Sequence, residues 1–136
     1  MKEVVQKLIL LNKTVSTMES CTGGYIANSI TNVEGSSNIF KFGAVTYSNE
    51  YKIKMGVSAY VIDKYSVYSI ETSNEMSKKI CDFTDSNYGI GITGKLNRVD
   101  LNKFYNQTVT VTNISREENK IALSKIISIM LLNIIK

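Results

Sequence analysis

Apolar and polar residues alternate along the chain with two periods, which predicts helices and strands in turn. Residues 2–11 place apolar side chains at helical spacing with Lys and Gln outside, so we expect an amphipathic helix. Residues 14–18 are rich in β-branched side chains and predict a strand. Residues 25–32 return to the helical period. This alternation favours an α/β fold.

The same alternation continues through the middle of the chain. We expect a strand over residues 39–47 and a short helix over 52–55 that ends at Gly56. Ser69 is placed to cap a further helix, which carries a buried stripe over residues 70–83. Turn-forming residues separate these segments.

The last third of the chain predicts two more strands and a long helix. Residues 88–93 are apolar, and residues 108–112 alternate strictly, as in a half-exposed or edge strand. Ser115 is placed to cap a final helix with a broad apolar face. The pattern of residues 95–107 does not fix a conformation. We therefore expect one domain, residues 1–136, with helices on both faces of a mixed sheet.

Glycines interrupt two of the predicted strands. Gly43 lies inside the first of them, which indicates a bulge or a close approach of the backbone. The run from Gly89 to Gly94 matches the letters of the dinucleotide-binding pattern G-x-G-x-x-G. That motif requires its glycines to follow a strand and open a helix, whereas these lie inside a strand. The match therefore gives little support for a dinucleotide site.

Composition and charge exclude several classes of protein. The chain has 136 residues, 43% of them hydrophobic, and a formal charge of +4, which is ordinary for a globular domain. Its 16 basic residues are scattered among 12 acidic ones, so we expect no nucleic-acid partner. No apolar run reaches the roughly 18 residues of a membrane span and no signal peptide precedes the first helix, so we expect a cytoplasmic protein without a membrane partner. Cys21 and Cys81 are far apart and are expected to be free thiols.

The chain contains no histidine. This excludes Ser-His-Asp and Cys-His catalysis and removes the commonest zinc ligand, and we expect neither a metal nor a cofactor. Any general base would have to be Lys, Asp, Glu or Tyr. A serine activated by a lysine is then the most natural nucleophile that this chain can form.

Two polar segments that follow predicted strands are candidates for such a site. The first, Glu19–Gly24, has the sequence Glu-Ser-Cys-Thr-Gly-Gly and opens a helix, where unpaired N–H groups and the helix dipole favour an anion. An ordinary helix cap with glycines for a tight turn explains it equally well. The second, Tyr47–Lys52, clusters hydroxyls, an amide and an amine. A partly buried Lys52 would serve as a base, whereas a surface lysine would simply be solvated.

Several blocks of residues occur in one order and spacing. They are Glu19-Ser-Cys-Thr-Gly-Gly24, Gly35-Ser36-Ser37, Val45-Thr-Tyr-Ser-Asn49 followed by Lys52 and Gly56-Val57, and Ile92-Thr93-Gly94. Together they resemble the C-terminal domain of the competence/damage-inducible protein CinA, a domain that also occurs alone as nicotinamide mononucleotide (NMN) deamidase.

This resemblance implies a three-layer α/β/α sandwich and the hydrolysis of NMN to nicotinate mononucleotide and ammonia. Ser20 matches the nucleophile and Lys52 the base that activates it. The implied partner is a small nucleotide substrate, and its matched contacts are Ser36, Ser37, Tyr47, Ser48, Asn49, Thr93 and Arg116. The chemistry adds the turn Thr22, Gly23 and Gly24, whose backbone amides would hold the oxyanion, and makes Arg116 the leading candidate to bind the phosphate.

The resemblance weakens after Gly94. The family has a glycine-rich loop there, whereas residues 95–107 contain neither glycine nor proline. Two functions therefore remain: a lysine-assisted NMN amidohydrolase, or a catalytically degenerate relative that binds a nucleotide or acts as a scaffold. We expect hydrolysis, because the blocks that hold Ser20 and Lys52 are intact. Family members often associate, and the apolar face of the last helix would allow a homodimer.

Overall fold

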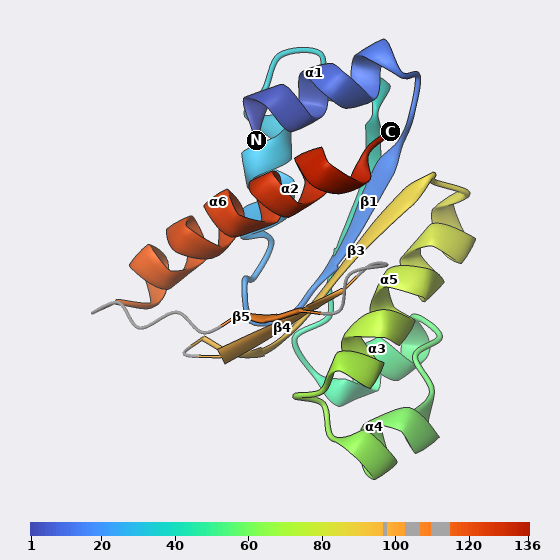
Figure 1. The fold of residues 1–136 in the computed structure, drawn as a ribbon. Coiled ribbons are helices and arrows are strands. Elements are labelled where there is room, and N and C mark those ends of the chain that lie inside the picture. The colour runs from blue at the N-terminus through green and yellow to red at the C-terminus, as the bar shows by residue number, and fades with distance from the viewer. Residues whose placement is uncertain (97, 103–106, 110–114) are drawn as a thin grey trace.

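The computed structural model describes residues 1–96, 98–102, 107–109 and 115–136, and the strands within them form one five-stranded sheet (Figure 1). The order is β2-β1-β3-β4-β5. β1 pairs in parallel with β2 and β3, whereas β3, β4 and β5 are antiparallel neighbours, so the expected mixed sheet is confirmed. The strands are β1 (Val15–Glu19), β2 (Phe40–Val45), β3 (Tyr88–Lys95), β4 (Arg98–Asn102) and β5 (Gln107–Val109).

The helices cover both faces of the sheet, which makes three layers (Figure 1). On one face lie α1 (Lys2–Leu10), α2 (Tyr25–Thr31) and α6 (Arg116–Ile134). On the other lie α3 (Asn49–Lys54), α4 (Ala59–Tyr65) and α5 (Ile70–Thr84), and a short 3-10 helix (Ser36–Asn38) precedes β2. None of the described helices is long and apolar enough to cross a membrane.

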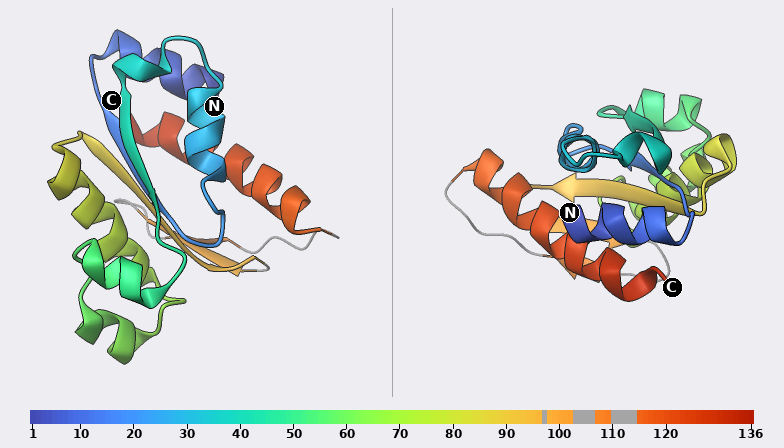
Figure 2. Two further views of the ribbon diagram at one scale, coloured as in Figure 1. Left: turned by 180° about the vertical axis from the view of Figure 1, so that it is seen from behind. Right: turned by 90° about the horizontal axis from the view of Figure 1, so that it is seen from above.

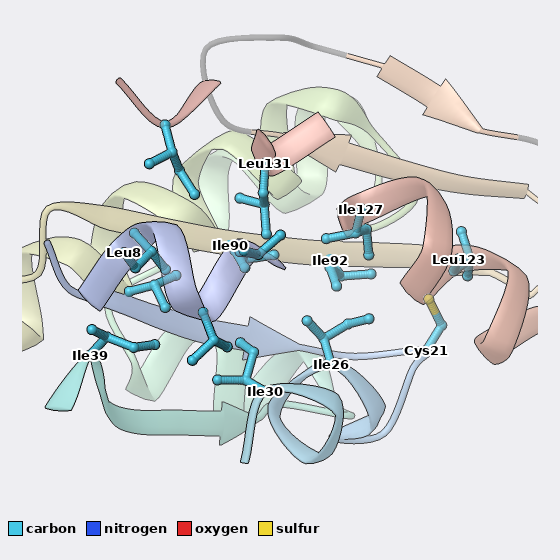
Figure 3. Close-up of a cluster of buried hydrophobic side chains, with 14 of the residues drawn as sticks. Leu8, Cys21, Ile26, Ile30, Ile39, Ile90, Ile92, Leu123, Ile127 and Leu131 are labelled. Carbon is cyan, nitrogen blue, oxygen red and sulfur yellow. The ribbon is translucent and has the colours of Figure 1, made fainter. Parts of the chain in front are cut away.

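Each face of the sheet has its own apolar core. The larger core joins α1, α2 and α6 to β3 through side chains such as Leu8, Ile26, Ile92 and Leu123 (Figure 3). The smaller core packs α4 and α5 against β1, where Met18 is fully buried. The two cores fix the sheet from both sides, and so fix the positions of the loops at its ends.

Serines begin four of the helices by accepting a hydrogen bond from the backbone N–H three residues later. Ser69 and Ser115 were expected as caps and are confirmed, and Ser115 forms a full capping box with Glu118. Ser48 and Ser58 do the same for α3 and α4. The sequence pattern did not predict α4, because this short helix buries only Ile62 and has no apolar stripe.

Strands β3 and β4 extend into residues 95–107, for which the sequence did not predict a conformation. β3 continues two residues beyond the expected end, and β4 then pairs with it in antiparallel register. β5 coincides with the start of the expected strand 108–112, whose last three residues lie outside the described residues.

Glycines at two places allow close backbone packing, and the sequence indicated this for one of them, Gly43. The register between β1 and β2 shifts before Gly43, and a Cβ there would lie 2.6 Å from Thr17 Oγ1. A Cβ at Gly91 would overlap the Ser73 carbonyl oxygen and lie 2.6 Å from the Ser77 backbone nitrogen, both in α5. The glycines of β3 therefore serve helix–strand packing, which confirms that the G-x-G-x-x-G letters do not form a dinucleotide turn.

We expect Gly91→Ala to lower the free energy of unfolding by about 3 kcal/mol or more, because its methyl group would displace the α5 backbone. Urea titration followed by circular dichroism measures this change. Gly35→Ala is the matched control: Gly35 has a φ of 82° and would meet only the end of the Ile9 side chain, so a loss of about 1–2 kcal/mol is expected. Equal losses for the two variants would contradict the packing argument.

Candidate active site

At the end of β1, the consecutive side chains of Glu19 and Ser20 point to opposite faces of the sheet. Glu19 points toward α2, where its carboxylate accepts hydrogen bonds from the backbone N–H groups of Ile26 and Ala27 and from the Thr22 hydroxyl. The fully buried carboxylate therefore lies at the first turn of this helix, where unpaired N–H groups and the helix dipole stabilise a negative charge. Ser20 is the next residue and points to the face that carries α3.

Ser20 and Lys52 form a hydrogen-bonded pair. The Lys52 Nζ lies 3.0 Å from Ser20 Oγ, although 32 residues separate the two. The same amine donates to the Thr46 carbonyl oxygen at 2.7 Å. The Ser48 cap starts α3 three residues after that carbonyl, so the helix carries Lys52 back beneath the end of β1.

Burial lowers the pKa of Lys52 below its ordinary value. The side chain is 1% exposed, and withdrawal from water disfavours the charged ammonium form. Among the described residues, no carboxylate forms a salt bridge with it, because the one ion pair within them joins Lys54 to Glu50. Lys52 is therefore neutral more often than a surface lysine is, and its neutral amine can accept a proton.

The glycines after Ser20 shape the turn into α2. Gly23 and Gly24 have φ angles of 63° and 90°, in the left-handed region that favours glycine. The Gly23 N–H donates to the Ser20 carbonyl oxygen at 2.9 Å, so this amide is already engaged. Neither glycine is among the described residues that line the cavity beside Ser20. Their observed role is conformational, and their contact with an oxyanion stays a prediction.

A cavity of about 540 Å³ opens beside the Ser20–Lys52 pair. Its walls come from four parts of the chain: the β2–α3 loop, the segment before α5, the end of β3 and the start of α6. The described residues that line it are Ser20, Cys21, Tyr47, Asn49, Lys52, Val67, Tyr68, Thr93, Gly94, Lys95, Leu96, Ser115, Arg116 and Asn119.

Six of the expected site residues meet at this cavity, namely Ser20, Lys52, Tyr47, Asn49, Thr93 and Arg116. Arg116, the first residue of α6, donates from Nη2 to the Tyr47 hydroxyl at 3.2 Å and so links two distant segments across the cavity wall. The Thr93 hydroxyl donates to the Val67 carbonyl oxygen at 2.7 Å, which ties the end of β3 to the segment before α5.

The other expected contacts lie elsewhere. Ser48 caps α3, and Thr22 donates its hydroxyl proton to Glu19, so both support the site without lining the cavity. Ser36 and Ser37 lie in the 3-10 helix before β2, at the opposite end of that strand from α3 (Figure 2). The structure does not bring these two serines to the Ser20 cavity of the same chain.

Eight of the described lining residues were not among the predicted contacts: Cys21, Val67, Tyr68, Gly94, Lys95, Leu96, Ser115 and Asn119. Lys95 directly follows Thr93-Gly94, so the rule that ligands collect at the ends of strands would have found it. Asn119 lies one turn after Ser115 and faces the same side of α6 as Arg116. Tyr68 precedes the Ser69 cap and carried no local indication of its role.

Cys21 follows the serine but belongs to the core. Its sulfur points toward Leu123 of α6 (Figure 3), and the side chain is buried. Burial raises the pKa of this thiol to about 11. A thiol with that pKa stays protonated at neutral pH, which makes Cys21 a poor candidate for a nucleophile.

Comparison with known proteins identifies the family. The family model of the CinA C-terminal domain matches residues 1–97. A protein named as competence-damage inducible from Alkaliphilus oremlandii is 42% identical over 96 residues, and a CinA-like protein from Endomicrobium trichonymphae is 46% identical over 93. These matches cover 69% and 67% of this chain, but only 23% and 22% of the relatives. The chain thus spans less than a quarter of their length.

Solved structures extend the likeness over nearly the whole chain. A competence/damage inducible protein from Agrobacterium tumefaciens superposes with a TM-score of 0.88 at 27% identity and covers 97% of this chain and 93% of its own. A CinA superfamily protein from Enterobacter cloacae gives a TM-score of 0.90 at 21% identity, over 99% and 92% of the two chains, which shows the shared fold. The chain belongs to the CinA C-terminal domain family.

Proposed function

We propose that this protein hydrolyses the carboxamide of nicotinamide mononucleotide, releasing ammonia, through a Ser20–Lys52 pair. The observation that carries the proposal is the buried Lys52 amine 3.0 Å from the Ser20 hydroxyl, at the edge of a cavity large enough for a small-molecule ligand. Membership of the CinA C-terminal domain family supports it. NMN itself comes from the resemblance of the sequence blocks to that family.

Thr46 prepares Lys52 to act as the base. Its carbonyl oxygen accepts one N–H of the amine, which fixes the orientation of the nitrogen. In the neutral amine, the lone pair can then accept the proton of the Ser20 hydroxyl, so the hydrogen bond between them reverses direction. Burial supplies the neutral form by lowering the Lys52 pKa.

The reaction then has two steps, acylation of Ser20 and hydrolysis of the acyl-enzyme. Ser20 Oγ forms a bond to the carboxamide carbon while its proton passes to Lys52. The tetrahedral intermediate expels the amide nitrogen, which takes that proton and leaves as ammonia. Water gives a proton to Lys52 and attacks the acyl-enzyme, and this proton passes to Ser20 as the carboxylic acid product leaves. The acid then releases its remaining proton to solvent and becomes the carboxylate. Cys21, which lines the cavity directly after Ser20, is the candidate whose backbone N–H would hold the oxyanion.

Arg116, Tyr47 and Asn49 are the proposed ligand contacts in the mouth of the cavity. Arg116 offers a permanent positive charge with several donors, the group best suited to an acidic oxygen. Its hydrogen bond to the Tyr47 hydroxyl holds both side chains in place before a ligand arrives. This arrangement reduces the entropy lost on binding.

A non-catalytic nucleotide-binding protein is the second candidate, and one observation favours it. The family model matches only residues 1–97, whereas Ser115, Arg116 and Asn119 of the cavity wall lie beyond that match. A changed wall can keep affinity for a ligand while losing the alignment that catalysis requires. NMN binding without turnover would favour this candidate.

Ammonia release from NMN should fall at least about a thousandfold in both Ser20→Ala and Lys52→Ala, because nucleophile and base act as one unit. A coupled glutamate dehydrogenase assay measures the release. Ser37→Ala is the matched control, since this exposed serine lies at the opposite end of β2, and it should retain wild-type rates. Wild-type rates in Ser20→Ala would rule out the proposed mechanism.

The turnover rate should rise with pH and level off above the pKa of Lys52, which lies below its ordinary 10.5. The sign follows because only the neutral amine accepts the Ser20 proton, and deprotonation proceeds as the pH rises. A kcat profile measured between about pH 6 and 10 tests this. Lys52→Arg should be inactive throughout, because its guanidinium stays protonated. A rate that falls as the pH rises from neutrality would contradict the role of Lys52.

Cys21 should resist alkylation in the folded protein. With a pKa of about 11, only about one thiol in a thousand is ionised at pH 8. Iodoacetamide treatment followed by peptide mass spectrometry should show Cys21 unmodified in native protein and modified in urea. Native labelling at the rate of a free cysteine would show that this thiol, rather than the Ser20 hydroxyl, is the more reactive group.

A further inference from the structure

Lys95 and Tyr68 form a cation–aromatic pair on the wall of the Ser20 cavity. The Lys95 Nζ lies 5.3 Å from the centroid of the Tyr68 ring, and both residues line the cavity. Lys95 is the last residue of β3, and Tyr68 lies directly before the Ser69 cap of α5. The two residues are exposed to solvent at this site, so a ligand that enters the cavity can reach them.

The charged residues among the described cavity lining are all basic. The described lining residues include three bases, Lys52, Lys95 and Arg116, and none of them is Asp or Glu. Lys52 is directed to Ser20 and Thr46. Arg116 bonds to a neutral hydroxyl, and no described carboxylate forms a salt bridge with Lys95 or Arg116. Among the described residues, the positive charges of Lys95 and Arg116 therefore face the ligand space without a carboxylate partner, which favours an acidic ligand.

Tyr68 makes Lys95 more effective as an anion-binding group. A free lysine side chain loses much rotational freedom when it binds a ligand. An aromatic ring within about 6 Å of an ammonium attracts it and limits that freedom beforehand, while its N–H donors stay available. The pair thus resembles the link between Arg116 and Tyr47, since each tyrosine holds one cation.

We propose that Lys95, held by Tyr68, is a specificity-determining residue that binds the phosphate of the nucleotide substrate together with Arg116. The identity of that substrate rests on the proposed function, whereas the preference for an acidic ligand rests on the cavity itself. Lys95 lies outside the pair that performs the chemistry. Its loss should therefore weaken substrate binding and leave the bond-breaking step unchanged.

The test compares NMN with nicotinamide riboside, which has the same carboxamide but no phosphate. Both ligands are titrated calorimetrically into Ser20→Ala protein, where turnover does not interfere, with and without Lys95→Met. We expect Lys95→Met to weaken NMN binding about tenfold or more and to leave riboside binding unchanged. In the active protein, the same substitution should raise KM for NMN by a similar factor with kcat preserved, and added salt should reduce the difference.

Lys64→Met is the matched control. Lys64 also lies over tyrosine rings, 5.4 Å from the Tyr60 centroid and 5.0 Å from that of Tyr65, but it is not among the described cavity residues. It should bind NMN as the wild type does. Tyr68→Phe, which keeps the ring, should also behave as wild type, whereas Tyr68→Leu should show part of the Lys95→Met effect.

The outcomes separate this inference from the proposed function. NMN turnover with a KM that does not depend on Lys95 overturns the inference alone. Lys95-dependent NMN binding without turnover supports the inference and overturns the proposed hydrolysis. Equal weakening of NMN and riboside binding by Lys95→Met would show a general structural effect and overturn the phosphate contact. Absence of NMN binding overturns both. Inorganic phosphate, added as a competitor, should displace NMN from wild-type protein more effectively than from Lys95→Met.

Discussion

The alternation of side chains at the end of β1 is the constraint on which the site depends. Because successive residues of a strand point to opposite faces, Glu19 and Ser20 cannot serve the same side of the sheet. Glu19 secures the first turn of α2 on one face, and Ser20 meets Lys52 on the other. A shift of one residue would exchange them and place a carboxylate beside the buried amine. The two adjacent residues therefore divide structure and chemistry between the layers.

Residues 1–97 and helix α6 contribute different residues to the cavity. Both residues of the proposed catalytic pair lie within residues 1–97, which match the family model. The ligand wall is shared, since Tyr47, Tyr68 and Lys95 come from the matched part and Arg116 from α6 beyond it. The Ser115 capping box fixes where α6 begins and thereby fixes Arg116, its first residue.

Local patterns in the sequence were sufficient for most elements, but not for α4 and β4, and they did not predict the contacts between elements. Serine caps and apolar periods each have a local physical cause, and the structure agrees with them. The approach of Lys52 to Ser20 depends on how α3 returns beneath β1, so only the resemblance of whole blocks suggested it. Ser36 and Ser37 precede β2 and Lys52 follows it, so the two serines lie at the opposite end of this strand from Lys52 of the same chain. Tyr68 and Lys95 are adjacent only through the tertiary fold.

The buried amine of Lys52 also couples the fold to the proton concentration of the solvent. In the unfolded chain this lysine regains its ordinary pKa of 10.5, whereas in the folded chain burial holds the pKa lower. Between the two values the unfolded chain binds more protons, so unfolding takes up a proton. The contribution of Lys52 to stability is therefore least favourable below the folded pKa and improves as the pH rises toward 10.5. Protonation of Lys52, which would block its proposed role as a base, is thus the same event that lowers the stability of the fold.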